Sequence, residues 1–465
     1  MDKQNIFATF ACEMAKKHKR VPTELGERPV GTLLWQYALP AIIAMTATSL
    51  YNIVDRAFIG HIVGKQALAG LAATFPFMNL GAAFGAMVGV GASTVISVRL
   101  GQKDYRTAQQ VLGNSVMLNL ILGTLFTIVF WIYLDPVLYV FGASEATIPY
   151  ARDYMKIILA FNVIGHSYLG LNNVMRAAGH PRTAMLCTLM TVVVNAILDP
   201  LFMLVLRLGI QGAAIATVIS QAIALVVVSS LFCRKDELLR FKRGIYGLRL
   251  DIVRQTLSIG MAPFLLNLCA CLVVLLINQG MLRYGGDDAV GAYSIVNSVV
   301  FFFLMIVIGL NQGMQPIVGY NWGARQDDRV WQCLRLALVA GTGITFAGFL
   351  ICEIYPRLPS LIFTTDEHII SLASRGFRLC VSIFPLVGAQ MVISNFFQSI
   401  GHAGKSIFLS VSRQMLFLIP GLLILPRYWG LDGVWISIPI ADFISMCAAS
   451  VMLWLTIRHV CKKSS

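Results

Sequence analysis

The sequence predicts an all-α polytopic membrane protein with 12 transmembrane helices, arranged as two six-helix bundles related by a pseudo-two-fold axis along the membrane normal. Three observations predict this class. First, 57% of the 465 residues are hydrophobic and 12% are charged, against roughly 25% charged residues in soluble domains. Second, basic residues are distributed very unequally between alternate loops. Third, the two halves share motifs at a nearly constant offset. A soluble globular enzyme and a disordered chain are excluded.

Twelve stretches are long and apolar enough to span a bilayer, since a spanning helix needs roughly 20 apolar residues. No stretch alternates between polar and apolar residues as a barrel strand does, and a bilayer otherwise admits only helices. The expected spans are 32–60, 67–98, 111–134, 150–173, 183–206, 210–232, 256–282, 289–319, 334–355, 369–399, 407–426 and 432–456.

Residues 1–30 are polar and basic and contain no cleavable signal peptide. Ile6, Phe7, Phe10 and Met14 follow one another at near-helical spacing. This cytoplasmic N-terminal segment is therefore expected to be either a short interfacial helix or a loose tail.

The charges predict the orientation. Of the 36 Lys and Arg residues, 25 fall in the two termini and in the loops after the even-numbered spans, and five fall in the opposite loops. Cytoplasmic loops carry the excess of Lys and Arg, so both termini are expected in the cytoplasm. The net charge of +14 is then explained by topology and by contact with the lipid bilayer. No nucleic-acid partner is expected.

The two halves of the chain are related by an internal duplication with an offset of 221–223 residues. The order of the matches is the same in both halves, which a chance match would not produce. The predicted domains are a first lobe (31–233), a cytoplasmic linker (234–255), a second lobe (256–457) and a cytoplasmic tail (458–465). The matching segments are 100–103 with 322–325, 141–145 with 363–367, 175–180 with 397–402, 208–212 with 429–433, and Pro40 with Pro263.

Three acidic residues lie well inside predicted spans: Asp55, Asp199 and Asp442. A carboxylate at the centre of a bilayer costs about 2.5–3.5 kcal/mol on insertion scales, so each needs a partner, a water path or a proton. Asp55 and Asp199 are each about two turns or less from the outer end of their spans. Both carboxyl groups are therefore expected at similar depth in the outer half of the first lobe.

Two further oxygen-bearing side chains are expected at that depth. Asn195 precedes Asp199 by four residues and shares its helix face, and Thr217 lies seven residues into the next span. Oxygen ligands with two carboxylates suit Na⁺, or a proton shared between coupled acids. Alternatively the group is a static polar cluster in which Arg56 is the counter-ion of Asp55.

The second lobe lacks these residues. A scaffold role would more easily have kept them in both copies, so an acidic site confined to the first lobe is favoured. Asp442 is the deep acid of the second lobe and is expected either to pair with a polar neighbour or to form a secondary site. The equivalent positions hold Asn278 for Asp55, Phe417 for Asn195, Gly421 for Asp199 and Ile438 for Thr217.

From about residue 30 to residue 456 the chain resembles the multidrug and toxic compound extrusion (MATE) transporters, in their DinF-like/MepA-like prokaryotic branch. The features that carry the resemblance are Pro40 and Asp55 on the first span, the 101–104 loop with its repeat at 323–325, the 176–179 turn, Asn195 with Asp199, and Gly209 with Gly212.

The resemblance implies a cation-coupled antiporter in the plasma (cytoplasmic, or inner) membrane of a prokaryote. Asp55, Asn195, Asp199 and Thr217 match the cation-binding or protonation positions of this branch.

The resemblance also implies accessory roles. Tyr154 and Asn172 match accessory polar positions of the same network, and Pro40 matches the proline at which the first helix bends. The NorM-like branch instead has a glutamate on its seventh helix. The seventh span here offers Asn267, Asn278 and Gln279, which argues against a sodium site of that kind.

The expected function is export of amphipathic, cationic organic compounds in exchange for H⁺ or Na⁺. The oxygen set serves both ions equally. No cofactor, and no metal other than Na⁺ at the four predicted positions, is expected, and a two-lobe path can work as a monomer. The first alternative is a flippase for lipid-linked or polysaccharide precursors. The second is a membrane-embedded enzyme, for which His166 is the best mid-span histidine.

Overall fold

The computed structural model describes residues 24–464 apart from residues 63–64 and 365, and within them every regular element is a helix. Most of the predicted N-terminal segment, with its expected interfacial helix or tail, lies outside the described residues. The helices are α2 (Glu24–Glu27), α3 (Val30–Ile62), α4 (Lys65–Gly101), α5 (Tyr105–Ile132), α6 (Leu134–Val140), α7 (Ile148–Ala160), α8 (Asn162–Ala177), α9 (Pro181–Pro200), the π-helix η1 (Leu201–Val205), α10 (Ile210–Phe232), α11 (Leu250–Gly323), α12 (Asp327–Ile354), α13 (Arg357–Leu361), α14 (Glu367–Cys380), α15 (Phe384–Ser399), α16 (Ala403–Val411), the π-helix η2 (Ser412–Leu418) and α17 (Ile419–Ser464).

Each of the twelve predicted spans coincides with a helix or with a pair of consecutive helices. Eight helical stretches of the described chain are long and apolar enough to cross a membrane, or nine if α14 and α15, bent by 54° at their junction, form one span. Two of these stretches hold two spans each, because the backbone leaves the helical region at Gly286 in α11 and at Gly430 in α17. Both glycines have positive φ, a conformation that side chains disfavour. The predicted fold class is confirmed.

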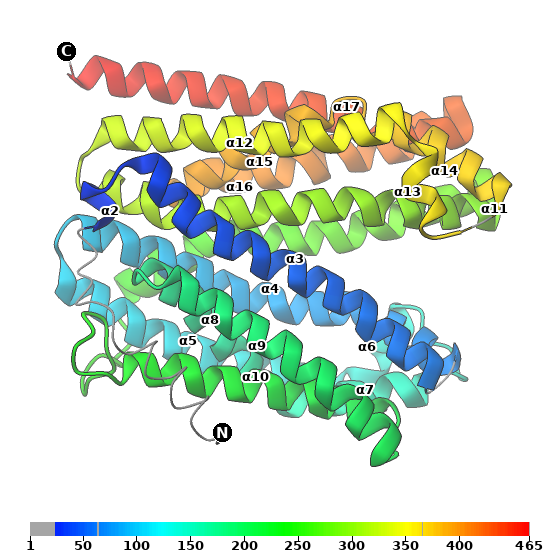
Figure 1. Ribbon diagram of the computed structural model, residues 1–465, viewed down its shortest axis with the longest axis horizontal. Helices are drawn as coiled ribbons and strands as arrows, with labels where there is room; N and C mark the ends of the chain where they lie inside the picture. The colour runs from blue at the N-terminus through cyan, green and yellow to red at the C-terminus, as the bar shows by residue number, and fades with distance from the viewer. Residues whose placement is uncertain (1–23, 63–64, 365, 465) are drawn as a thin grey trace, which may run out of the picture.

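The molecule has two halves, an N-half formed by α3–α10 and a C-half formed by α11–α17 (Figure 1). One hydrophobic core contains only N-half residues, including Phe77 and Tyr154, and a second contains only C-half residues, including Phe377 and Trp435. A third core draws on both halves and on Leu25 of α2. The halves are therefore packed together at one end and have separate cores at the other.

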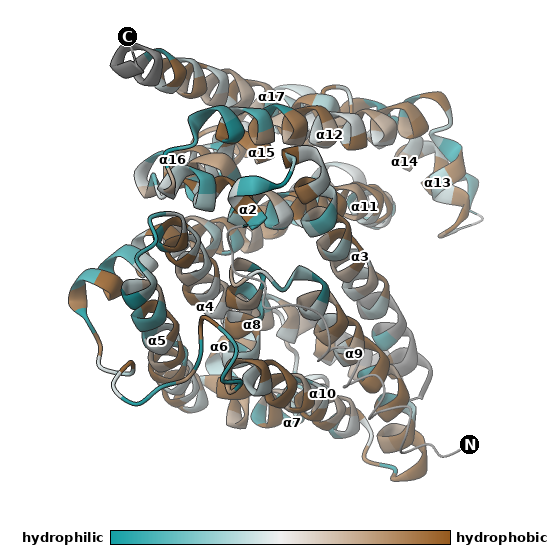
Figure 2. Cartoon of the chain, turned by 60° about the vertical axis from the view of Figure 1, so that its left-hand side comes forward, coloured by the Kyte–Doolittle hydropathy of each residue, from teal (hydrophilic) through white to brown (hydrophobic). Residues whose placement is uncertain are grey.

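We call the shared end, which carries α2, residues 233–249 and the last turns of α17, the basic end. The opposite end, which carries α6 and α13, is the far end (Figure 1). The helices of both halves are largely apolar along their length, and polar residues are concentrated toward the connections (Figure 2). This distribution is typical of a bundle surrounded by lipid.

The contact between the halves at the basic end depends on glycines. A Cβ atom on Gly101 of α4 would lie 1.9 Å from the carbonyl oxygen of Tyr320, and one on Gly323 of α11 would lie 2.1 Å from the carbonyl oxygen of Val98. These two contacts are related to each other by the repeat offset, since Gly101 corresponds to Gly323 and Val98 to Tyr320. The duplicated sequence therefore makes a duplicated contact across the pseudo-two-fold axis.

Buried hydrogen bonds cross the same contact. The Gln315 amide nitrogen of α11 donates to the Ser93 hydroxyl at 3.0 Å and to the Thr94 hydroxyl at 2.6 Å, both on α4. Asn321 of α11 donates to the carbonyl oxygen of Leu25 at 3.0 Å. Because buried donors and acceptors need partners, these bonds fix how the halves are seated on each other.

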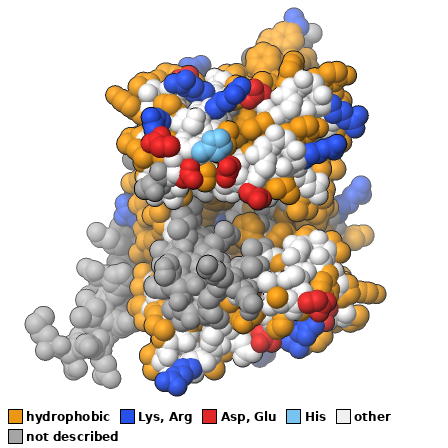
Figure 3. Space-filling model, turned by 90° about the vertical axis from the view of Figure 1, so that its right-hand side faces the viewer, with side chains coloured by type: hydrophobic (Ala, Val, Ile, Leu, Met, Phe, Trp, Pro, Cys, Tyr) orange, Lys and Arg blue, Asp and Glu red, His pale blue; other side chains and the backbone are white. Residues whose placement is uncertain are grey.

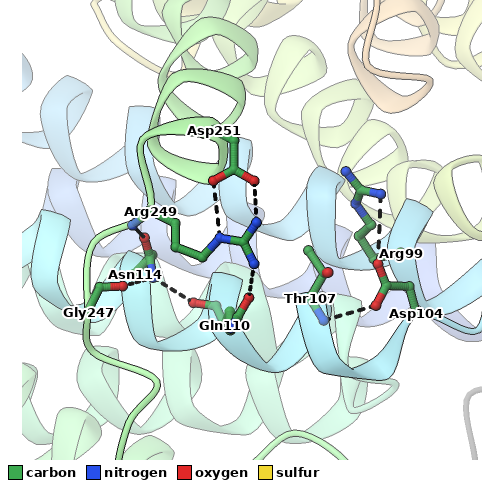
Figure 4. A network of polar contacts seen from close by, with 8 residues as sticks. All are labelled: Arg99, Asp104, Thr107, Gln110, Asn114, Gly247, Arg249 and Asp251. Carbon is green, nitrogen blue, oxygen red and sulfur yellow. Dashed lines mark hydrogen bonds and ion pairs between the residues drawn. The ribbon is translucent and has the colours of Figure 1, made fainter.

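The connection between the halves is bound to the N-half (Figure 4). The Asn114 side chain of α5 donates to the carbonyl oxygen of Gly247 at 3.0 Å and accepts from the Arg249 backbone N–H at 2.9 Å, and Arg249 donates to Gln110 at 2.7 Å. Hydrogen bonds from Arg249 also hold the pKa of Asp251 below its usual value. The linker thus follows α5 as far as Arg249.

The helices on either side of two predicted boundaries are longer than expected. α11 begins at Leu250, inside the predicted linker 234–255, because Asp251 occupies its first turn, where an acidic residue favours a helix start. α17 continues to Ser464, through most of the predicted tail. Residues 458–464 contain neither proline nor glycine, so nothing in that stretch ends the helix.

At the far end, ion pairs connect elements of the C-half to one another (Figure 3). Arg375 of α14 pairs with Asp432 of α17, and Arg357 of α13 pairs with Glu367 of α14. Such exposed pairs add little stability. Both connect C-half elements only, in keeping with the separate cores of this end.

Candidate functional site: a polar cluster in the N-half

The buried polar cluster of the N-half is built around Asp199, near the end of α9. Asp199 is 0% exposed and Asn195, one turn earlier, is 4% exposed. The Asn195 amide donates to Asp199 Oδ1 at 2.7 Å. Pro200 follows and has no N–H to donate, and the chain then forms the π-helical turn η1. Such turns are frequent at functional sites.

Helix α3 supplies a hydroxyl and a second carboxyl group. Tyr51 donates from its hydroxyl to Asp199 Oδ2 at 2.9 Å. Asp55, one turn further along α3, interacts with the carboxyl group of Asp199. Two carboxyl groups therefore meet where the far-end half of α3 crosses the end of α9.

Helices α10 and α7 complete the cluster. The Thr217 hydroxyl of α10 lies 3.4 Å from Asn195 Oδ1. Tyr154 of α7 is 2% exposed, and its hydroxyl interacts with the side chain of Thr217. The structure thus brings together five of the residues singled out in the sequence: Asp55, Tyr154, Asn195, Asp199 and Thr217.

Tyr51 is the member that the sequence analysis missed. Its signal is its position one turn before Asp55 on the same helix, where a hydroxyl can reach the same site. Tyrosines are also common at membrane interfaces, so this spacing does not by itself distinguish a site residue from an interfacial one.

Asn172 belongs to a different group of hydrogen bonds. It donates to the carbonyl oxygen of Ala184 at 3.1 Å and accepts from Arg176 at 2.7 Å, and Arg176 also donates to Asn173. This group lies toward the basic end of α8, away from Asp199. An accessory role of Asn172 in the same network stays a prediction.

Pro40 lies within α3, which is continuous from Val30 to Ile62. The backbone on both sides of it contacts the C-half: Cβ atoms on Gly313 and Gly309 of α11 would lie 2.4 Å from Ala38 and 2.6 Å from Ile42. The hinge role of Pro40 stays a prediction. Helix α3 contacts α11 of the C-half around this proline and contacts Asp199 further along.

Asp442, the deep acid of the C-half, is paired. Its Oδ1 lies 3.5 Å from Nε of Arg413, and the two side chains are 10% and 22% exposed. The structure therefore offers a partner for this carboxylate, as the first of the two sequence hypotheses requires. Asp442 as a secondary ion site stays a prediction.

His166, the residue considered for an enzyme, lies on α8 among aromatic side chains. It is 3% exposed, and the centroid of its ring is 5.9 Å from that of Phe126. Helices α4 and α5 approach it closely, since Cβ atoms on Gly85 and Gly123 would contact it. Its surroundings are those of a packed core position.

Comparison with known proteins agrees with this architecture. The family model described as MatE matches the chain twice, over residues 40–201 and 263–423. The two matches fall at the offset found in the sequence, so the duplication is confirmed.

Similar proteins cover nearly the whole chain. It is 28% identical over 426 residues to the "Multidrug export protein MepA" of Staphylococcus haemolyticus (strain JCSC1435), which covers 92% of this chain and 93% of that protein. The "MATE multidrug transporter DinF-BH", solved in complex with a rhodamine dye, is 34% identical, covers 94% of this chain and 98% of its own, and superposes with a TM-score of 0.86. A crystal structure of "MATE in the bent conformation" has the same fold, with a TM-score of 0.90 at 24% identity over 96% of this chain and 99% of its own.

Proposed function

The chain belongs to the MatE family, and from that membership we propose that it exports amphipathic organic cations in exchange for H⁺ or Na⁺, with coupling at the Asp55–Asp199 cluster. The family makes it a multi-pass membrane transporter of the multidrug-exporter type, not an enzyme. The coupling ion, its site and the charge of the substrate are parts of the proposal.

The observation that carries the proposal is the convergence of four helices on one buried carboxylate. Tyr51, Asp55, Tyr154, Asn195 and Thr217 surround Asp199 with oxygen and amide groups. Two negative charges in contact inside a bilayer repel each other and lack solvent. A single bound cation, either a shared proton or a sodium ion held by oxygen ligands, removes this penalty.

The position of α3 suggests how ion binding is coupled to movement. One part of α3 bonds to Asp199 through Tyr51, and the part around Pro40 packs against the C-half. Neutralising Asp199 weakens the charge-assisted hydrogen bond from Tyr51. We propose that α3 then bends at Pro40 and changes its packing on the C-half, which favours substrate release. Loss of the ion to the cytoplasm resets the cycle.

The proposed orientation places the basic end, and with it both termini, in the cytoplasm of a prokaryotic cell. The positive-inside distribution of Lys and Arg supports this orientation. The structure would then be outward-facing, because the halves share a core at the basic end and have separate cores at the far end. The proposed units are the lobes 31–233 and 256–457, joined by the linker 234–255.

Support for the substrate class comes from the relatives and from the composition. One relative carries the name of a multidrug export protein, and another was solved with a bound rhodamine dye. The chain has 19 Met and 27 Phe, side chains that suit an adaptable apolar wall, and aromatic faces attract cations. The flippase alternative would be favoured instead if lipid-linked precursors, and not small cations, were moved by the purified protein.

The test is gradient-driven exchange of the same rhodamine dye in proteoliposomes, with H⁺ and Na⁺ gradients imposed separately. We expect Asp55→Asn and Asp199→Asn to reduce gradient-driven exchange to the level of protein-free liposomes. The matched control is Asn278→Ala, at the position equivalent to Asp55 in the C-half, which should keep exchange. Full gradient-driven exchange in both aspartate variants would refute the coupling site. Whichever ion drives the wild type identifies the coupling ion.

A further inference from the structure

A groove on the outside of the C-half is unrelated to the polar cluster. It has a volume of about 690 Å³ and lies between α12, α15 and α17, within the range of roughly 300–1,000 Å³ typical of ligand sites. Its walls are almost entirely apolar, and Thr342 and Ser450 are their hydroxyl-bearing residues. Val339 is 69% exposed and Trp454 is 55% exposed, so the groove opens to the surroundings of the protein and not to the space between the halves.

The helix packing explains the groove. Helix α15 packs against both α12 and α17 and forms the floor between them (Figure 1). It approaches α12 closely, since a Cβ on Gly388 would lie 2.3 Å from the carbonyl oxygen of Gly341. Gly343, one of the lining residues, has open space where its side chain would be, with nothing within 4 Å. The missing side chain at Gly343 keeps the groove empty of protein atoms.

The length of the groove matches one membrane leaflet. On α17 its lining runs from Met446 to Ile457, which is about 16 Å along a helix. The hydrocarbon core of a bilayer is about 30 Å thick, so one leaflet is about half of that. An acyl chain inserted from one membrane surface would therefore lie along the groove for its full length.

Cationic side chains mark one end of the groove. Arg335 precedes Val339 by one turn on α12, and Arg458 follows Trp454 by one turn on α17, with its guanidinium carbon 4.8 Å from the centroid of the Trp454 ring. Both arginines are exposed, and both lie toward the basic end, where α12 begins and α17 ends (Figure 1). On α12 the acids Asp327 and Asp328 lie about two turns further out.

We propose that this groove binds one acyl chain of an anionic phospholipid, whose phosphate lies between Arg335 and Arg458. The apolar walls suit the chain, which gains about 0.8 kcal/mol for each buried CH₂ group, and basic sites at helix ends suit an anionic headgroup. The same two arginines disfavour an organic cation, so the groove is not a second substrate site.

The experiment is native mass spectrometry of the purified full chain, after exchange into micelles with equal amounts of phosphatidylglycerol and phosphatidylcholine. The wild type should retain one phosphatidylglycerol in preference to phosphatidylcholine by roughly thirtyfold, the factor expected for two basic residues. The double variant Arg335→Gln/Arg458→Gln should lose the preference. Gly343→Phe should lose the bound lipid, whereas Gly404→Phe, at an equally open glycine outside the groove, should keep it.

Equal retention of the two lipids by the wild type would overturn the proposal, as would undiminished retention in Gly343→Phe. Displacement of the lipid by the rhodamine dye, or a dimer that forms only when Gly343 is intact, would assign the groove to a drug or to a second copy instead. Because Gly343→Phe can fail to fold, a second measurement uses the wild type. A photoreactive acyl chain on phosphatidylglycerol should cross-link to peptides within 338–346 and 446–457, and cross-links elsewhere only would contradict the site.

Discussion

The N-half and the C-half have the same helix order, but they differ at the place where Asp199 lies. In the N-half, two aspartates, an asparagine and three hydroxyl groups meet there. In the C-half the equivalent positions hold Asn278, Phe417, Gly421 and Ile438, and Phe417 and Ile438 pack against the hydrophobic core. The same fold thus surrounds a polar cluster in one copy and apolar side chains in the other.

The largest of those apolar side chains is Trp435. It is 1% exposed, and its ring lies against Gly376, where a Cβ would be 2.7 Å from it. Gly376 is the repeat counterpart of Tyr154. The C-half therefore places an indole ring where the N-half places the Tyr154 side chain.

The comparison shows that this fold does not need acids at that depth. A buried ion cluster stabilises a protein less than well-packed apolar residues of similar volume do, and the C-half demonstrates the apolar solution. The retention of two aspartates in the N-half is then explained by function, in keeping with the proposed coupling site. The following three substitutions test this difference between the halves.

The largest effect is expected for Trp435→Ala. Removal of a fully buried tryptophan leaves a cavity beside Gly376 and should lower the free energy of unfolding by about 3–5 kcal/mol, measured by denaturation of the detergent-solubilised protein. Trp429→Ala, at a tryptophan that is 57% exposed, is the control and should change it little. An equally small effect at Trp435 would show that the C-half core is not organised around this ring.

A smaller effect is expected for Tyr51→Phe in the N-half. The substitution removes only the hydroxyl that donates to Asp199, a hydrogen bond to a charged group worth about 1.5–3 kcal/mol. Because this donor competes with the coupling ion for the carboxylate, the apparent ion affinity in exchange assays should increase roughly tenfold. The control is Val274→Ala at the equivalent C-half position. An unchanged affinity in Tyr51→Phe would separate Tyr51 from ion binding.

The smallest effect concerns the starts of α5 and α12, which are repeat counterparts. Asp104 caps α5 by accepting from the Thr107 backbone N–H at 3.1 Å, whereas Gln326 makes no side-chain cap for α12. We expect Asp104→Ala to lower the free energy of unfolding by about 1 kcal/mol and Gln326→Ala to leave it nearly unchanged.

The pH dependence of the cap gives a second readout. Hydrogen bonding from Thr107, with help from the charge of Arg99, lowers the pKa of Asp104 in the folded protein. A lowered pKa in the folded state stabilises the protein at pH values above the unfolded pKa, and this contribution is lost as the pH falls through the folded pKa. Thermal unfolding of the wild type and of Asp104→Ala should therefore converge in acid. A difference that stays constant down to low pH would exclude the carboxylate as the cause.

Much of the candidate site was predictable because of its depth in the membrane. Asp55 and Asp199 stand out as acids within apolar spans, and the one-turn spacing identifies Asn195. Tyr51 could not be singled out, because its contact with Asp199 depends on where α3 crosses α9. Nor could the pairing of Asp442 with Arg413, which lies 29 residues earlier and is brought beside it by the break at Gly430. Local spacing identifies neighbours on one helix but not neighbours on two.

The sequence by itself determined the class of protein, the twelve spans, the duplication and the acids of the first half. These follow from the cost of exposing polar groups to lipid, which acts on each segment separately and is therefore visible in the composition of that segment. Only the tertiary structure decided that Tyr51 reaches Asp199, that Trp435 fills the equivalent place in the C-half, and that the halves share a core at the basic end alone. These features depend on how side chains from distant helices fit together, and that fit depends on helix crossing positions that no single segment specifies.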